Sequence, residues 1–182
     1  MIETTRLRAT ETPEYRFVEE LMAEAFPREE RRDEADLRAI TRDEARFHNL
    51  VITDEGAPVG LITCWELGRF CYIEHFAILP TMRNRGYGRR VMELMQGRLN
   101  LPIVLEAEPP VEEVARRRIA FYQRLGFTLW QSPYLQPPYR ATDDFLPLCL
   151  MACGALDEAA DFTHVRETIH RVVYGHEATI QH

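Results

Sequence analysis

The stretch that decides the fold is Arg83-Asn84-Arg85-Gly86-Tyr87-Gly88. It follows an apolar, strand-like segment, residues 70–79, and precedes residues 89–99, whose apolar side chains recur at helical spacing. A strand, a short loop and a helix in this order present free backbone N–H groups at the positive end of the helix dipole. The glycines let the backbone approach an anion closely, and the arginines add positive charge. The pattern therefore predicts a loop that binds pyrophosphate.

Two better-known phosphate-binding motifs do not fit this loop. A Walker A loop requires Gly-x4-Gly-Lys-Ser/Thr, and the sequence contains no such run. A Rossmann fingerprint requires a third glycine three residues after Gly88, where this chain has Val91. The loop belongs to neither class.

A second motif, Ile119-Ala120-Phe121-Tyr122-Gln123-Arg124-Leu125-Gly126-Phe127, follows a short apolar stretch at residues 101–106. The two motifs, in this order and spacing, resemble those of the GCN5-related N-acetyltransferases (the GNAT superfamily). The resemblance is specific from about Ile52 to Phe127 and extends to Met151.

The resemblance implies a mixed α/β (α+β) fold with a central, mostly antiparallel sheet of six or seven strands flanked by helices. In that superfamily the sheet is splayed where acetyl-CoA inserts. Residues 1–154 are expected to form the acetyltransferase domain, and residues 155–182 a helical extension packed on the same domain.

Periodicity and breaker residues predict the remaining elements. Thr12 and Pro13 are a helix start, and a second, highly charged helix is expected from Glu29 to about Asp43. Further helices are expected at residues 111–125, burying Val111, and at residues 157–174. Strands are expected at residues 2–8, 47–53, 59–67, 127–130 and 145–152, with a proline- and tyrosine-rich loop at residues 132–140.

Composition limits the class of protein. The chain has 182 residues, 46% of them hydrophobic and 28% charged, which suits one soluble domain. No apolar run approaches the roughly 20 residues that span a bilayer, and the N-terminus lacks a signal-peptide core. The four cysteines read as reduced, buried thiols, so a cytoplasmic location is expected. Scattered histidines predict no metal site, and the net charge of −7 disfavours nucleic acid as a partner.

The resemblance assigns roles in cofactor binding residue by residue. The backbone of Phe76, Ala77 and Ile78 would bond the pantetheine arm, in the manner of an added strand. The pyrophosphate would be held by Gly86, Tyr87, Gly88 and Arg89, with Arg83, Asn84 and Arg85 at the rim. Phe121 of the second motif is also assigned to the cofactor. Many relatives carry an Asn where this chain has Ala115, so the main-chain contacts are expected to matter most.

Catalysis would require a general acid and a base. By resemblance Tyr122 would protonate the departing thiolate. The alternative is that Tyr122 is a structural tyrosine packed in the core. Glu74 on the apolar strand is a candidate base, although a structural carboxylate is as good a reading, and Glu106 is its rival by analogy with protein N-terminal acetyltransferases. His75 reads as a core histidine.

The function implied is transfer of an acetyl group from acetyl-CoA to a primary amine by direct attack in a ternary complex. The alternatives are a regulatory module that binds CoA without catalysis and a transferase that uses another acyl-CoA. The acceptor stays open, with a small cationic amine slightly favoured by the charge over a protein N-terminus. Arg31 or Arg32 could hold a carboxylate or phosphate of the acceptor, although their context favours a solvated charged turn, and Tyr134 and Tyr139 could line the acceptor pocket. A homodimer through the terminal helix also stays open.

Overall fold

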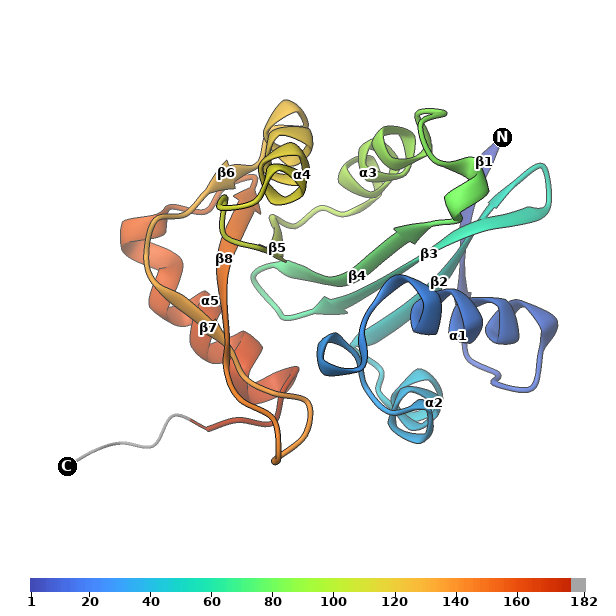
Figure 1. Ribbon diagram of the computed structural model, residues 1–182, viewed down its shortest axis with the longest axis horizontal. Helices are drawn as coiled ribbons and strands as arrows, with labels where there is room; N and C mark the ends of the chain where they lie inside the picture. The colour runs from blue at the N-terminus through green and yellow to red at the C-terminus, as the bar shows by residue number, and fades with distance from the viewer. Residues whose placement is uncertain (178–182) are drawn as a thin grey trace. The chain divides into compact units, whose positions relative to one another are not determined.

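A computed structural model describes residues 1–177 of the chain (Figure 1). Within that range the chain forms eight β-strands, five α-helices and two short 3-10 helices. These elements divide into two compact units, the first made of residues 1–66 and 73–100, the second of residues 67–72 and the described residues from 101 onward. The strand β4 (Cys71–Ile78) begins in the second unit and continues in the first. The expected mixed α/β fold class is confirmed.

The first unit is a sheet with strands in the order β1-β2-β3-β4, of which β1, β2 and β3 pair antiparallel. The helix α1 packs against β2 and β3, and α2 packs against β2. Its elements are β1 (Ile2–Leu7), α1 (Pro13–Ala25), η1 (Arg28–Glu30), α2 (Glu34–Asp43), β2 (Phe47–Asp54), β3 (Ala57–Glu66), η2 (Pro80–Met82) and α3 (Tyr87–Arg98).

The start of α1 follows directly from its sequence. The side chain of Thr12 accepts a hydrogen bond from the backbone N–H of Tyr15 at 3.2 Å, and Pro13 occupies the first helical position. Tyr15, Val18 and Leu21 then recur at helical spacing and are buried. The predicted helix start is confirmed.

The second unit is built around β8, which pairs antiparallel with β5, β6 and β7. In the β5 pair, Glu106 lies opposite Leu150. Trp130, which follows β6, is buried and donates its backbone N–H to the carbonyl of Leu150 at 2.9 Å. The elements are β5 (Ile103–Ala107), α4 (Glu113–Arg124), β6 (Thr128–Leu129), β7 (Tyr134–Gln136), β8 (Leu146–Cys153) and α5 (Glu158–Val172).

Two predicted helix starts are wrong. The helix expected from Glu29 begins at Glu34, because residues 28–30 form a 3-10 turn and Arg32 then turns inward to bind Glu74. The helix expected from Val111 begins at Glu113; Val111 itself lies in a turn after two prolines and is 72% exposed.

The second unit also differs from expectation at β7 and β8. The predicted proline- and tyrosine-rich loop contains the short strand β7, whose backbone pairs with β8, so the described residues form eight strands rather than six or seven. Cys64 and Cys71 are buried as predicted, whereas Cys149 and Cys153 on β8 are partly exposed. No helix among residues 1–177 is long and apolar enough to cross a membrane.

We expect Gly60→Ala to destabilise the first unit. A methyl group at Gly60 on β3 would lie 2.5 Å from the carbonyl oxygen of Ala77 and 2.9 Å from Cδ1 of Ile78, so β4 would have to move. The expected loss in the free energy of unfolding is about 1–3 kcal/mol, measured by urea denaturation.

The control is Gly97→Ala on the exposed side of α3, where a methyl group meets nothing within 4 Å. It should stabilise the protein by roughly 0.5–1 kcal/mol, because alanine favours helix more than glycine. Equal effects of the two variants would contradict the close approach of β3 and β4 at Gly60.

Candidate active site

The basic glycine loop ends where α3 begins, at Gly86. Gly86 has a φ of +77°, a left-handed conformation that glycine adopts without strain, and Asn84 has a φ of +61°. The first backbone hydrogen bond of α3 joins the N–H of Arg90 to the carbonyl of Gly86 at 3.2 Å. The loop is exposed, and its backbone turns sharply into the helix.

This geometry leaves amide groups available to a ligand. Within residues 1–177, the backbone N–H groups of Tyr87, Gly88 and Arg89 make no backbone hydrogen bond, as expected for the first turn of a helix. With the helix dipole, they favour an anion at this end of α3. The exposed side chains of Arg83 and Arg89 bond the carbonyl of Ile78 at 3.2 Å and the carboxylate of Glu93 at 2.7 Å.

The side chain of Tyr87 holds the loop against the sheet. Its hydroxyl donates to the carboxylate of Asp54, at the end of β2, at 2.7 Å, and its ring lies under the guanidinium of Arg90. The hydrogen bond to Asp54 raises the pKa of Tyr87. Tyr87 therefore fixes the backbone of the loop rather than offering its own side chain to a ligand.

The candidate pantetheine-binding residues, Phe76, Ala77 and Ile78, form the last three positions of β4. Ala77 is buried, whereas Phe76 and Ile78 are partly exposed. They lie in the same unit as the loop, and η2 connects the two.

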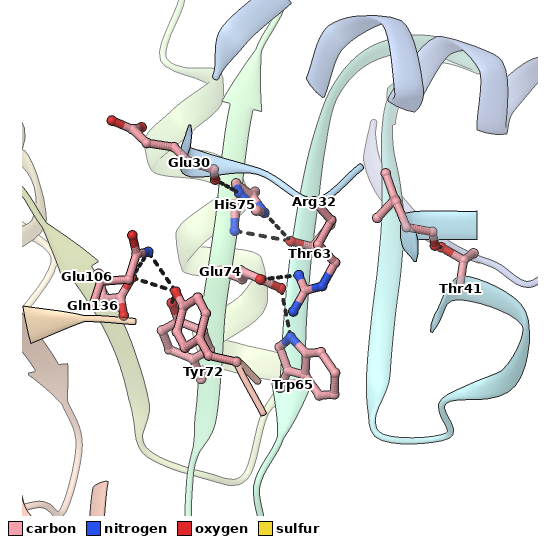
Figure 2. Close-up of polar contacts among 12 residues, drawn as sticks. Glu30, Arg32, Thr41, Thr63, Trp65, Tyr72, Glu74, His75, Glu106 and Gln136 are labelled. Atoms are coloured by element: carbon pink, nitrogen blue, oxygen red, sulfur yellow. Dashed lines mark hydrogen bonds and ion pairs between the residues drawn. The ribbon is translucent and has the colours of Figure 1, made fainter. Parts of the chain in front are cut away.

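Glu74, also on β4, lies in a buried polar cluster (Figure 2). Its side chain has no exposed surface and forms an ion pair with Arg32, whose side chain is only 9% exposed. The indole N–H of Trp65 donates to the other carboxylate oxygen at 2.8 Å. The Arg32 guanidinium lies 5.5 Å from the Trp65 ring centroid and 5.9 Å from that of Phe47. Protonating Glu74 would leave a buried arginine without its counter-ion, so this carboxylate is poorly suited to act as a base.

The acceptor-binding candidates Arg31 and Arg32 are both engaged within the first unit. Arg32 is not the solvated turn residue that its sequence context favours, because its charge is committed to Glu74. Arg31 donates from Nε to the carbonyl of Phe26 at 3.1 Å.

His75 is the core histidine that its position on β4 suggested. Its Nε2 lies 2.7 Å from the carbonyl of Glu30, to which it must donate, and its Nδ1 faces the hydroxyl of Thr63 at 3.4 Å. Burial lowers the pKa of His75, so the ring is neutral.

Glu106 lies on β5 within a cluster of neutral hydrogen-bond donors in the second unit (Figure 2). Tyr134 donates to Oε1 at 2.5 Å, while Gln136 and Tyr174 donate to Oε2 at 2.7 Å and 3.0 Å. Tyr72 also bonds to this carboxylate. Burial raises the pKa of Glu106 to about 7, and the hydrogen bonds from the tyrosines and the glutamine oppose that rise. Glu106 can therefore both gain and lose a proton near neutral pH, which suits a general base.

Tyr122 and Phe121 lie near the end of α4, with ring centroids 5.1 Å apart. The ring of Tyr122 also packs against Phe127 at 5.5 Å. Among residues 1–177, its hydroxyl makes no hydrogen bond to another residue. Burial raises the pKa of Tyr122 to about 12, so the group is a protonated potential acid.

The expected site residues thus fall into two groups. Glu74, residues 76–78 and the loop lie in the first unit, and Glu106, Phe121 and Tyr122 in the second. The sequence reasoning missed Tyr72, Gln136 and Tyr174 as partners of Glu106. Tyr134 and Gln136 are two residues apart, the spacing that places both on one side of a strand; recognising β7 would have revealed them.

Comparisons with known proteins point to one family. The sequence model of the acetyltransferase (GNAT) family matches residues 12–127. A solved structure from Bacteroides thetaiotaomicron, assigned to the GNAT family of acetyltransferases, is 48% identical with a TM-score of 0.93, covering 95% of this chain and 98% of that one. No curated protein matches.

More distant solved structures share the fold. The ribosomal-protein-S18-alanine N-acetyltransferase of Escherichia coli is 22% identical with a TM-score of 0.56, covering 84% of this chain and 93% of its own. A spermidine N-acetyltransferase SpeG chimera from Vibrio cholerae and hSSAT is 17% identical with a TM-score of 0.62, covering 84% and 94%.

We expect Arg32→Met to lower the free energy of unfolding by about 3–5 kcal/mol, because it leaves Glu74 buried without a counter-ion. Adding Glu74→Gln should recover part of that loss, since the unpaired charge is then removed. The measurement is urea denaturation of the single and double variants.

The matched control is Arg42→Met, which removes a pair between exposed side chains, Arg42 and Asp43, and should cost no more than about 1 kcal/mol. If Arg32→Met lowers the free energy of unfolding no more than the control does, the buried ion pair contributes no more to stability than an exposed one.

Proposed function

Because the chain belongs to the acetyltransferase (GNAT) family, we propose that it transfers an acetyl group from acetyl-CoA to a primary amine. The observation that carries this proposal is the loop at residues 83–89, whose free amides and left-handed Gly86 suit a pyrophosphate and which lies within the family match. The cytoplasm is its expected compartment.

The proposed acetyl-CoA contacts are mostly from the main chain. The amides of Tyr87, Gly88 and Arg89 would bond the pyrophosphate, with Arg83 and Arg85 adding charge at the rim. The backbone of residues 76–78 would bond the pantetheine arm as a strand, and Phe121 would contact the cofactor beside Tyr122.

We assign the base to Glu106 rather than Glu74. Glu74 is held in a buried ion pair, whereas Glu106 is surrounded by neutral partners and its pKa of about 7 lets it accept a proton. Glu106 would take the proton of the attacking amine, the C–N bond would form as the C–S bond breaks, and Tyr122 would give its proton to the sulfur. No acyl-enzyme is required.

We favour a small cationic amine as the acceptor over a protein N-terminus. The support is the net charge of −7, which attracts cations. Fold neighbours that act on spermidine and on a protein alanine leave both classes to be tried.

We expect Gly86→Glu to abolish binding of acetyl-CoA, because it places a side chain and a negative charge where the pyrophosphate would lie. Isothermal titration calorimetry of the wild type should show saturable binding. The control is Gly68→Glu, since Gly68 has nearly the same φ, +78° against +77°, and at neither position would a methyl group meet anything within 4 Å.

The two variants therefore carry the same backbone strain and the same added charge. Loss of binding in both would attribute the effect to strain, and no binding by the wild type at millimolar acetyl-CoA would refute the function.

We expect Tyr122→Phe to lower kcat by about 100-fold or more while leaving acetyl-CoA affinity nearly unchanged, because it removes only the acid. The assay is release of CoA thiol with a panel of polyamines, amino acids, aminoglycosides and peptide N-termini. Tyr15→Phe, which removes a buried hydroxyl from the first unit, should keep full turnover.

Unchanged turnover in Tyr122→Phe would remove Tyr122 from the mechanism. Binding of acetyl-CoA by the wild type, without acetylation of any amine in the panel, would favour a regulatory module that binds CoA.

A further inference from the structure

Most partners of Glu106 lie beyond the residues that the family model matches. That match ends at residue 127, whereas Tyr134 and Gln136 lie on β7 and Tyr174 follows α5. Only Tyr72, at the start of β4, lies within it. Most of the surroundings of the proposed base are therefore supplied by the part of the chain that follows the family match.

The hydroxyl of Tyr174 connects this cluster. It donates to Oε2 of Glu106 at 3.0 Å and accepts from Nε2 of Gln136 at 2.7 Å. The hydroxyl of Tyr72 lies 3.1 Å away. A phenol has one hydrogen to donate and two lone pairs. An ionised Glu106 can only accept, so the hydrogen of Tyr174 points at Oε2 while its oxygen accepts from Gln136.

The end of α5 holds Tyr174 in place. Its N–H bonds the carbonyl of Ile169 at 3.4 Å, and Gly175 then turns the chain with a φ of +64°, so that the N–H of His176 reaches the carbonyl of His170 at 2.8 Å. The ring of Tyr174 packs against Tyr139 with centroids 5.1 Å apart. The helix itself is anchored by fully buried Val165 and Ile169.

We propose that Tyr174 is a positioning residue for Glu106, which makes the C-terminal helix part of the catalytic apparatus. This rests on the proposed function, in which Glu106 is the base. The Tyr174 hydrogen bond fixes the orientation of the carboxylate and favours its ionised form, so the base is free to accept the amine proton. Without that bond, a larger share of Glu106 stays protonated at neutral pH.

The other groups around Glu106 are uncharged, so none of them favours the ionised carboxylate by carrying a positive charge. Tyr72 from β4, and Tyr134 and Gln136 from β7, are neutral donors. From α5, His170 packs against the ring of Tyr134, and burial lowers its pKa to about 4, so it is uncharged at neutral pH. Hydrogen bonds from neutral groups therefore oppose the effect of burial on Glu106.

The test is an infrared titration of the protonated-carboxyl band between pH 5 and pH 9, approximately the range around neutrality in which Glu106 exchanges its proton. Glu106→Gln identifies the band by its loss. In Tyr174→Phe the midpoint should rise by about 0.5–1 pH unit, the size of one lost hydrogen bond. The acid limb of the pH profile of kcat should move with it.

A second variant should keep the fold and shift the titration midpoint of Glu106 in the opposite direction. Placing 3-fluorotyrosine at position 174 makes the phenol a stronger donor of nearly the same shape, so the midpoint should fall. The packing control is Val18→Ala, which removes a fully buried side chain from α1 in the first unit and should leave the midpoint unchanged.

A midpoint that stays fixed in Tyr174→Phe and in the fluorinated protein overturns the proposal. So does an equal shift in Val18→Ala, or a shifted midpoint with an unmoved acid limb. An acid limb that persists in Glu106→Gln refutes Glu106 as the base, so the failure of the proposed mechanism is distinguished from the failure of the role of Tyr174.

Discussion

A helix cannot satisfy its own first amide N–H groups, and in the first unit contacts at both ends of α3 hold the helix that presents them. Gly86 turns the chain into the helix through a left-handed conformation, and Tyr87 ties the first turn to Asp54. At the other end, Arg98 donates to the hydroxyl of Thr4 at 2.8 Å. These contacts fix the backbone, so under the proposed function the pyrophosphate would meet donors that are already oriented.

The two candidate glutamates show how environment separates carboxylates of the same type. Glu74 receives a permanent cation, Arg32, together with an indole donor, and becomes part of the scaffold that holds the segment before α2 on the sheet. Glu106 receives only neutral donors, which stabilise its charge without fixing its protonation state. A charged partner makes a structural carboxylate, whereas neutral partners and burial leave one that can exchange a proton.

Local signals in the sequence were sufficient for the loop, for the start of α1 and for the two motifs that indicated the family. These signals are local because they determine structure only a few residues away: Thr12 and Pro13 start α1, and Gly86 precedes the amphipathic helix α3. The late start of α2 was not predictable, because it depends on Arg32 reaching a residue 42 positions away. Likewise, β7 is defined by pairing with β8, and Tyr174 meets Glu106 across 68 positions. Such contacts depend on tertiary packing, which cannot be predicted from a short segment of sequence.

The fluorescence of the two buried tryptophans reports separately on the packing of the two units. The sequence contains two tryptophans; Trp65 lies in the first unit against Arg32, and Trp130 lies in the second beside Phe162. Each is 3% exposed, so each emission spectrum responds to loss of packing in its own unit. With one indole replaced, the fluorescence that remains comes from a single unit, and comparison of the two forms distinguishes cooperative melting from stepwise melting.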